Sequence, residues 1–432
     1  MKNKIVDKIV KPVYHATFRP LVWNARKMKW FLYSKKQISI RKEISKENIK
    51  KDKKIRVLFI MQYPEMWGSE RTVYETMKED NRFQVEILAI PKSGGVNPKI
   101  KSFESKNEAL DYCKKEGISA INAFSNGKWL DLSSMKSDYI FLQRPYDECM
   151  PDEYEMSKLM KHGLLCYIPY SGHITQGVHL KIEFNHILLR YLYLFFADSS
   201  HTAEYVRLRS GKELSSKTRK IFEFGFPRFD LIKRLGEQPE QNQINVLWTP
   251  RWSADDSNDR SYFLDYYETM MDYFKNHREL NLVIRPHPLM FTNFVEKKVL
   301  SEQDVSEIKK RVANEPNISF DENLDYNISF RKSTFLVSDI SSLLLEYFIT
   351  GKPIVFCGEI RDFTTDGVKM ADQFYSVKDK EQLVKQLDLL SSGNDPGLNE
   401  RNEIIKQVFQ VDGKAGLRIA EAVYQDAQEL IR

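Results

Sequence analysis

The sequence lacks the short motifs that mark several common enzyme classes. No GxGxxG follows the first strand expected in either half, so a dinucleotide cofactor is unsupported. GxxxxGK(S/T), HExxH and GxSxG are also absent, which argues against P-loop ATPases, zinc metalloproteases and α/β-hydrolases. No Asp-x-Asp occurs, which argues against a metal-dependent, single-domain nucleotide-sugar transferase. We therefore expect no bound metal ion and no cofactor.

Cysteines and long apolar runs are also scarce. The chain has 4 Cys among 432 residues, none in a CxxC pair, which argues against a zinc ribbon or a disulfide framework and fits a reducing compartment. The N-terminus shows no apolar core typical of a signal peptide. The longest apolar candidate, 187–197, contains Arg190 and is shorter than the ~20 residues that a membrane-spanning helix needs.

Positive charge is concentrated at the N-terminus. Residues 1–56 contain 18 Lys and Arg against 4 Asp and Glu, a net charge of +14, whereas the whole chain carries +6. Residues 57–432 therefore carry −8. The basic excess belongs to the N-terminal segment, and the rest of the chain gives no sign of a nucleic-acid-binding surface.

The basic segment 1–54 also carries large apolar side chains. Ile5, Ile9 and Val13 share one helical face, and Trp, Phe and Leu are dense between 21 and 33. Cationic residues interleaved with Trp and Phe suit the surface of an anionic membrane. We expect residues 1–50 to form a membrane-associating extension that ends in a charged linker at 46–54. A solvated basic tail, or one that binds RNA without specificity, is the alternative.

Beyond residue 54, short apolar runs alternate with helix-like segments, which predicts βαβ units and parallel sheets. The expected strands of the first half are 55–61, 83–90, 118–124, 138–143, 164–170 and 192–199. Those of the second half are 244–253, 281–285, 317–320, 334–338, 353–357 and 373–377. The predicted fold class is α/β, with two Rossmann-like domains facing each other across a cleft. Their predicted ranges are 55–235 and 236–412, with a hinge at 221–235 and a C-terminal helix at 413–432.

Two cationic motifs end expected strands of the second half. NLVIRPHP supplies Arg285 and His287 on a loop stiffened by two prolines, and TPRW supplies Arg251. Ligands of open α/β sheets sit at the carboxyl ends of strands, and guanidinium and imidazole groups suit a phosphate there. The structural alternatives are a His that caps a turn and an Arg exposed to solvent.

The segment SDISSLLLEYF predicts a strand end, a turn and the start of a helix. Ser338 or Asp339 is a candidate cap, and Ser341 and Ser342 fall in the first helical turn, where backbone N–H groups favour an anion. Glu346 lies one to two turns further on and either reaches a ribose or lies on a polar face. Ordinary helix capping explains the same pattern.

A glycine-flanked loop, YSGHITQGVH, follows an expected strand of the first half. It places His173 and His179 toward the second half. A neutral His accepts a proton near pH 7, so His173 is the candidate general base. A structural histidine is the alternative.

These motifs together resemble one family. TPRW, LVIRPHP, SDISSLLLEY and DGKAGLRIAEAV (412–423) are similar to the CDP-glycerol glycerophosphotransferase family of teichoic-acid primases, polymerases and their capsule relatives. GFPRFD (225–230) resembles the family's Gly-x-Pro-Arg-x-Asp segment. The family's His-Gly-Thr-Pro-x-Lys loop is altered here to SGHITQGVHLK, which lacks the Thr-Pro and leaves His173 and Lys181 as candidate counterparts.

The resemblance implies a GT-B-like fold whose C-terminal half holds the donor. The residues implied to bind the donor diphosphate are Arg285, His287, Ser341 and Ser342, and those implied to support the site or the ribose are Asp339 and Glu346. To this set the sequence adds Arg251 and Ser338 as donor-binding candidates and His173 and His287 as catalytic candidates.

The implied activity is the transfer of a polyol phosphate, most simply glycerol phosphate, from a CDP-activated donor to a hydroxyl of a lipid-linked glycan or polymer. CMP would be released at the cytoplasmic face of the membrane, to which the enzyme would bind peripherally. Two alternatives stay open: a GT-B nucleotide-sugar glycosyltransferase, and a non-catalytic scaffold that binds an activated precursor.

Overall fold

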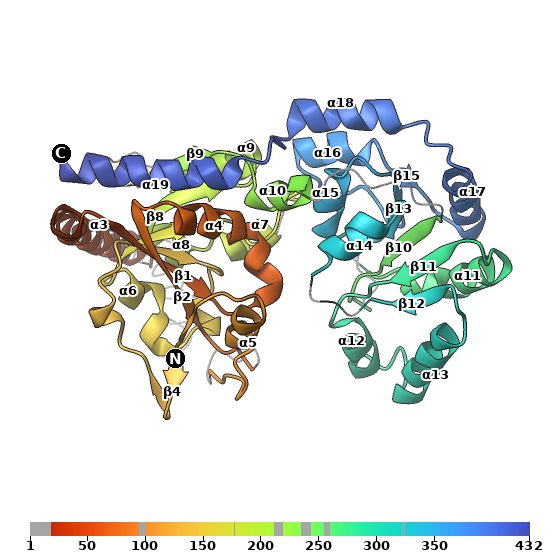
Figure 1. Cartoon of the computed structure of the whole chain (residues 1–432), viewed down its shortest axis with the longest axis horizontal. Helices are drawn as coiled ribbons and strands as arrows, with labels where there is room; N and C mark the ends of the chain where they lie inside the picture. Colours follow the sequence, from red (N-terminus) through yellow and green to blue (C-terminus); the bar gives the residue numbers. More distant parts are fainter. Residues whose placement is uncertain are drawn as a thin grey trace, which may run out of the picture.

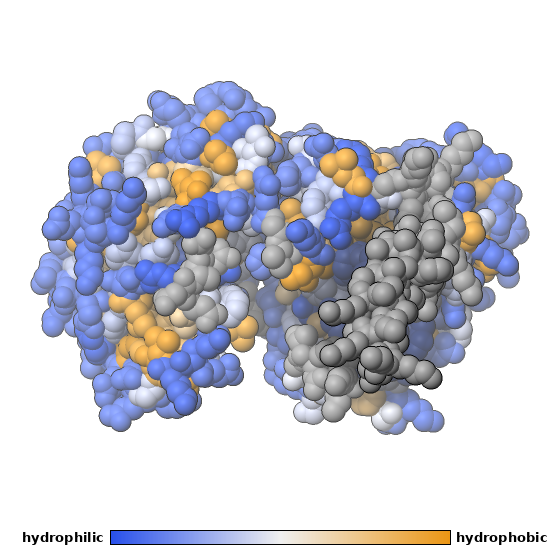
Figure 2. All heavy atoms as spheres, turned by 180° about the vertical axis from the view of Figure 1, so that it is seen from behind, coloured by the Kyte–Doolittle hydropathy of each residue, from blue (hydrophilic) through white to orange (hydrophobic). Residues whose placement is uncertain are grey.

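The structure is a computed structural model that describes residues 19–94, 101–176, 178–210, 219–234, 243–254, 260–321, 323 and 325–432. Ile5, Ile9 and Val13, on which the expected first helix depends, lie outside the described residues. Two α/β halves lie side by side (Figure 1), and the space-filling view from behind shows separate apolar patches in a largely hydrophilic surface (Figure 2).

Among the described residues, the first half contains a sheet of seven parallel strands in the order β3-β2-β1-β6-β7-β8-β9. Its strands are β1 (Ile55–Met61), β2 (Phe83–Ala89), β3 (Ile121–Asn122), β6 (Tyr139–Leu142), β7 (Leu164–Tyr167), β8 (Leu192–Ala197) and β9 (Lys220–Glu223). A small hairpin pairs β4 (Phe124–Ser125) with β5 (Lys128–Trp129). The segment expected to be a hinge therefore begins as β9, the edge strand of this sheet.

The second half contains, within its described part, a sheet of six parallel strands in the order β12-β11-β10-β13-β14-β15. Its strands are β10 (Asn245–Thr249), β11 (Asn281–Ile284), β12 (Ile318–Phe320), β13 (Phe335–Ser338), β14 (Ile354–Phe356) and β15 (Tyr375–Ser376). In both sheets the order of the strands reverses next to the first strand, as in dinucleotide-binding folds. This reversal creates one topological switch point between β1 and β6 and another between β10 and β13.

Helices cover both sheets (Figure 1). Those before β10 are α3 (Arg19–Asp52), η3 (Pro64–Ser69), α4 (Arg71–Glu79), α5 (Glu108–Lys115), η4 (Leu132–Ser134), η5 (Asp147–Cys149), η6 (Asp152–Tyr154), α6 (Met156–Leu159), α7 (Val178–Glu183), α8 (His186–Tyr191), α9 (Ser200–Ser210) and α10 (Pro227–Arg234). Those after it are α11 (Phe263–Asn276), α12 (Met290–Glu296), α13 (Glu302–Ala313), α14 (Asn327–Lys332), α15 (Leu343–Phe348), α16 (Thr365–Ala371), α17 (Lys380–Ser391), α18 (Leu398–Val408) and α19 (Ala415–Ile431).

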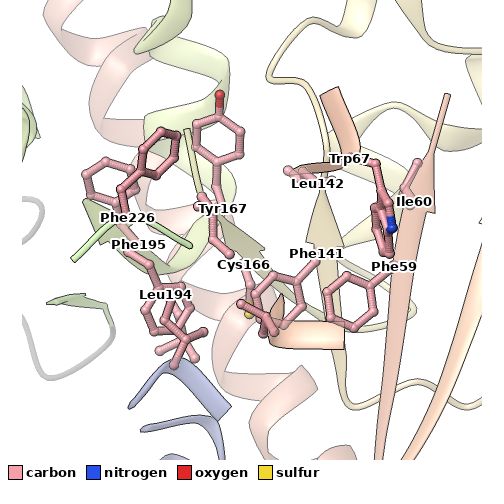
Figure 3. Close-up of a cluster of buried hydrophobic side chains, with 14 of the residues drawn as sticks. Phe59, Ile60, Trp67, Phe141, Leu142, Cys166, Tyr167, Leu194, Phe195 and Phe226 are labelled. Atoms are coloured by element: carbon pink, nitrogen blue, oxygen red, sulfur yellow. The ribbon is translucent and has the colours of Figure 1, made fainter. Parts of the chain in front are cut away.

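The core of the first half is rich in aromatic rings. Phe59 of β1 and Phe141 of β6 stack with their centroids 4.7 Å apart and their planes 11° apart (Figure 3). The row continues to Phe196 of β8 and Phe222 of β9, with centroid separations of 6.0 and 5.4 Å between neighbouring rings. Each ring removes a large apolar area from water, and the stacking holds the strands in one register.

Helix α3 corrects the expectation of a charged linker at 46–54. The helix runs to Asp52, and one face is buried against the first half at Ser34, Ile38, Arg41, Ser45 and Ile49. The spacing of three and four residues places these side chains on a single helical stripe. The dense Lys and Glu around them concealed this stripe in the sequence.

The C-terminal helix α19 returns to the first half, where it packs against α4 and α3 (Figure 1). Asp426 on its buried face accepts hydrogen bonds from Tyr139 and Tyr193 at 2.7 and 2.9 Å. The chain thus crosses between the halves twice. None of the helices in the described part of the chain is both long enough and apolar enough to cross a lipid bilayer.

The two halves also touch at the loop after β7. Thr175 pairs with Phe363 as an antiparallel bridge, and the Thr364 N–H donates to the Ile174 carbonyl at 2.8 Å. A Cβ added to Gly367 would lie 2.2 Å from that carbonyl oxygen, so only glycine permits this approach. The carboxyl edge of the first sheet therefore faces the second half.

Candidate functional site

The motifs of the second half meet at the carboxyl edge of its sheet. Because β10 pairs with both β11 and β13, the loops after these three strands are neighbours. The His287 N–H donates to the Pro250 carbonyl at 3.0 Å, and the Arg251 N–H donates to Asp339 Oδ2 at 2.8 Å. Arg251 also donates from Nη1 to the Ile340 carbonyl at 3.0 Å. The predicted cluster thus forms at the switch point.

Asp339 organises these loops from a buried position. Its Oδ2 accepts hydrogen bonds from the N–H groups of Arg251 and Tyr262 and from Ser261 Oγ, at 2.8, 3.1 and 3.3 Å. Burial outweighs these hydrogen bonds and raises the pKa of Asp339 to about 7. Asp339 is 0% exposed, so its role in the structure is to hold these loops in place.

Ser338 is not placed to touch a ligand. It is buried at the end of β13, where its Oγ accepts from Thr249 Oγ1 at 2.7 Å and donates to the Asp339 carbonyl at 2.8 Å. Its expected donor-binding role is corrected to one of joining β10 and β13. Ser342 is exposed, and Ser341 Oγ accepts from the Leu343 N–H at 3.1 Å. The helix that follows is only six residues long.

Arg285 is held in place by a carboxylate. Its Nη1 lies 2.8 Å from Asp321 Oδ2, and its guanidinium lies over the Tyr326 ring at 5.7 Å. Burial favours the neutral carboxyl, but hydrogen bonds from Ser329 and Asn323 and the Arg285 charge lower the pKa of Asp321. The Arg285 side chain keeps 16% of its surface exposed, so a remaining N–H edge can reach a ligand.

His287 is presented as a neutral imidazole. Its Nδ1 accepts from the Leu289 N–H at 3.2 Å, which places the ring proton on Nε2. Desolvation by the surrounding loops and then the Arg251 charge lower the pKa of His287 to about 4. The Trp252 ring lies 6.3 Å from the imidazole. In this state His287 can donate a hydrogen bond from Nε2 without carrying a charge of its own.

Glu346 is placed differently from its expected position at a ribose. It is 3% exposed, and its Oε2 lies 3.5 Å from Arg228 Nη1. The Tyr326 hydroxyl donates to the same oxygen, and Arg228 donates to that hydroxyl. Arg228 further reaches the Glu65 carbonyl of η3 at 3.4 Å. Glu346 therefore ties the donor half to α10 and η3 of the first half.

His173 lies in a buried triad of charges. Its Nε2 is 3.1 Å from Glu183 Oε2 and its Nδ1 is 3.3 Å from Asp198 Oδ2, with only 6% of the side chain exposed. Burial alone would lower the pKa of His173, but the two carboxylates outweigh it and raise the pKa to about 10. Both ring nitrogens face carboxylates, so this arrangement does not present His173 as a free base. The triad fixes the loop that carries the interdomain bridge.

Several residues of these networks escaped the sequence reasoning. They are Glu183, Asp198, Asp321 and Tyr326, whereas Arg228 lies in the GFPRFD segment that supports the family resemblance. Asp198 and Asp321 directly follow β8 and β12, so their place at a strand end was a usable signal. Within the described residues, no three His, Cys, Asp or Glu side chains are gathered in a way that could hold a metal ion.

The sequence profile of CDP-glycerol:poly(glycerophosphate) glycerophosphotransferases matches residues 188–425, more than half of the chain. The chain belongs to this family. The match covers every residue of the second half discussed above, and it also covers Arg228 of α10. A search of curated protein sequences found no significant match to the chain.

Solved structures show the same fold. A variant of the wall teichoic acid polymerase TagF has a TM-score of 0.55 and 14% identity, over 94% of this chain and 98% of that one. A UDP-N-acetylglucosamine 2-epimerase from Listeria monocytogenes has a TM-score of 0.58 and 14% identity, over 87% and 97% of the two chains. The UDP-GlcNAc 2-epimerase from Neisseria meningitidis, bound to UDP-GlcNAc, has a TM-score of 0.58 and 13% identity, over 86% of this chain and 100% of that one. The GT-B-like arrangement of two Rossmann-like domains is therefore confirmed.

Proposed function

We propose that the protein transfers glycerol phosphate from CDP-glycerol to a hydroxyl of a lipid-linked or polymeric cell-surface glycan. The observation that carries the proposal is the cluster of Arg251, Arg285 and His287 at the switch point of the donor sheet, in a chain of this family. A TagF structure soaked with CDPG, with a TM-score of 0.54 and 15% identity, supports the choice of donor.

In the proposed reaction, an acceptor hydroxyl oxygen attacks the phosphorus next to the glycerol. The bond from that phosphorus to the oxygen of CMP breaks, CMP leaves with the electron pair, and the hydroxyl proton passes to solvent. Phosphoryl transfer of this kind depends mainly on positioning and on stabilising charge. The two guanidinium groups and the Nε2–H of His287 supply that stabilisation.

The other residues at the two sheet edges take supporting roles in this proposal. Ser341 and Ser342 offer hydroxyls to the donor from the loop after β13, and Asp339 orients Arg251 through its backbone. His173 fixes the loop after β7 as a cation, and it does not remove the hydroxyl proton. The acceptor binds over the first half, and the basic N-terminal residues hold the enzyme peripherally on the anionic cytoplasmic face of the membrane.

An assay of nucleotide release tests the donor. The purified chain is incubated with membranes that contain acceptor, first with CDP-glycerol and then with UDP-sugars, while CMP and UDP are measured. We expect CMP release that depends on acceptor, with glycerol phosphate found in the product. UDP release without CMP release would establish the nucleotide-sugar glycosyltransferase instead. Binding of CDP-glycerol with no turnover of either donor would establish a precursor-binding scaffold.

A further inference from the structure

A second cationic cluster lies at the switch point of the first sheet. Arg144 follows β6, and its guanidinium lies 4.4 Å from the Tyr63 ring and 5.1 Å from the Tyr146 ring. The hydroxyl oxygens of Tyr146 and Tyr170 are 3.1 Å apart and share a hydrogen bond. Gln143 fixes the arrangement, since its Oε1 accepts from the Tyr63 N–H at 2.8 Å and its Nε2 donates to the Tyr63 carbonyl at 3.0 Å.

Arg144 differs from Arg228 and Arg285 in its charge balance. Arg228 and Arg285 each lie within 4 Å of a carboxylate, whereas no carboxylate lies within ion-pair distance of Arg144 among the described residues. Its Nε is buried and has no hydrogen-bond partner in the same part of the chain. A half-buried cation without a counter-ion is unfavourable, so the site as it stands is suited to receive an anion.

The position of the cluster points to the acceptor. Tyr63 and Arg144 follow β1 and β6, the two strands that flank the switch point, where ligands of such sheets bind. The neighbouring loop after β7 reaches the second half through the Thr175–Phe363 bridge, so this edge faces the donor cluster. In the proposed function, Arg251 and Arg285 bind the phosphates of CDP-glycerol. An anion at Arg144 therefore belongs to the other substrate.

The chemistry of the cluster selects a phosphate group. The guanidinium lies over the Tyr63 and Tyr146 rings, and a guanidinium can give the two-pronged hydrogen bonding that phosphate oxygens accept. Burial raises the pKa of Tyr63 and raises that of Tyr170 to about 12, so their hydroxyls stay protonated and can donate. The side chain of Arg144 is also held by the rings before a ligand arrives.

We propose that Arg144, with Tyr63, Tyr146 and Tyr170, binds a phosphate group of the acceptor and so aligns its terminal hydroxyl with the donor. The inference rests on the proposed function. Two parts of an acceptor carry such a group: the diphosphate of a lipid-linked primer and the last phosphodiester of a growing chain. Both present the same oxygens to Arg144.

Kinetics of Arg144→Gln and Arg144→Lys test the subsite, with CMP release measured against acceptor concentration and against CDP-glycerol concentration. We expect Arg144→Gln to raise the KM for acceptor about tenfold or more while the KM for CDP-glycerol stays the same. The KM of Arg144→Lys for acceptor should lie between those of the wild type and Arg144→Gln. Lys92→Gln is the matched control, since Lys92 lies 5.6 Å from the same Tyr63 ring but is already paired with Glu65 and Glu108. An unchanged KM for acceptor in folded Arg144→Gln would overturn the proposal.

Two acceptors separate the possible sources of the phosphate. If the KM effect appears with a primer that has no glycerol phosphate, the group is the lipid-linked diphosphate. If it appears only after one unit has been added, the group is the last phosphodiester. An effect with neither acceptor contradicts the subsite.

A binding measurement keeps the test independent of turnover and of the variant's fold. Glycerol 3-phosphate is titrated into the wild-type protein with the donor cluster saturated by CMP, and we expect it to compete with acceptor. If the wild type released no CMP from CDP-glycerol, the proposed donor would fail, but calorimetric titration of glycerol 3-phosphate into wild type and Arg144→Lys would still decide the subsite. Equal binding by both proteins, or none by the wild type, would refute it.

Discussion

Arg228 of α10 and Glu346 of α15 form an ion pair between the two halves of the molecule, with 3.5 Å between Nη1 and Oε2. The two side chains are 8% and 4% exposed. Burial alone would lower the pKa of Arg228, but the charge of Glu346 and the hydrogen bonds of the pair raise it, so the guanidinium stays charged. Because Tyr326 contacts this pair and also lies under Arg285, the interdomain contact is continuous with the donor cluster.

Removal of one partner of this pair should destabilise the protein strongly. Arg228→Ala leaves the Glu346 carboxylate buried without its cation, and loss of one partner of a buried pair typically costs about 3–5 kcal/mol. We expect a similar loss for Glu346→Ala. The free energy of unfolding from urea titration measures both effects.

The double variant Arg228→Met with Glu346→Leu provides the control. With both charges gone, no buried ion is left unpaired, so much of the stability should return. Turnover should stay low in the double variant, since Tyr326 loses the contacts that place it under Arg285. A double variant as unstable as the single variants would contradict the unpaired buried charge as the cause of their instability.

The charge of His173 predicts a specific dependence of stability on pH. Its folded pKa of about 10 lies above the ordinary value of about 6.5, so the protonated ring stabilises the fold below pH ~6.5. This contribution is lost as the pH rises through about 10. We expect the stability advantage of wild type over His173→Gln, measured by thermal unfolding, to shrink between pH 6.5 and pH 9.5.

Activity distinguishes a positioning cation from a general base at the same residue. A free base would give a rate that rises as the ring loses its proton. A cation that fixes the loop after β7 gives instead a kcat/KM that falls on the alkaline side, and His173→Lys should retain more activity than His173→Ala. A rate in wild type that increases up to pH 10 would restore the base role.

His287 should matter for turnover and little for stability. Replacement by Ala removes one hydrogen bond to the phosphates of CDP-glycerol. Hydrogen bonds to charged groups contribute about 1.5–3 kcal/mol, so we expect a roughly 10–100-fold loss in kcat/KM for CDP-glycerol. Since the pKa of His287 is about 4, its contribution should be constant from pH 6 to pH 9. His277→Ala, which precedes β11 at the opposite edge of the sheet, is the control and should keep activity. An unchanged kcat/KM for His287→Ala would remove it from the site.

A truncation after residue 31 tests the membrane-associating role. The removed segment carries eight Lys and Arg against one Asp, and each basic residue near an anionic surface contributes about 1 kcal/mol. We expect the shortened protein to fold normally and to lose binding to anionic vesicles in a sedimentation assay. A truncation after residue 50 should unfold the first half in addition, because it removes the buried Ile38 and Ile49. Vesicle binding that survives the shorter truncation would place the membrane contact elsewhere.

The donor cluster shows what residue patterns reveal by themselves. Arg251, Arg285 and Asp339 each lie within three residues of the end of an apolar run, and a parallel sheet brings the ends of adjacent strands to one edge. The strand order and the neighbouring loops then follow from general rules of such sheets. For the same reason, the two-domain fold and the family followed from the order of the motifs.

The sequence by itself determined the α/β fold, the family and the edge at which the donor cluster forms, because apolar periodicity and motif order are local properties of the chain. The tertiary structure alone decided which polar residues face a ligand and which face one another. His173 lies in a loop and Glu346 in helix α15, and both are polar residues within the motifs. Each lies in a buried ion pair, His173 with Glu183 and Asp198 and Glu346 with Arg228. Arg228 and Glu346 are 118 residues apart in the sequence, so only folding brings these two charges together. The protonation state of Arg228 depends on this contact and on its burial.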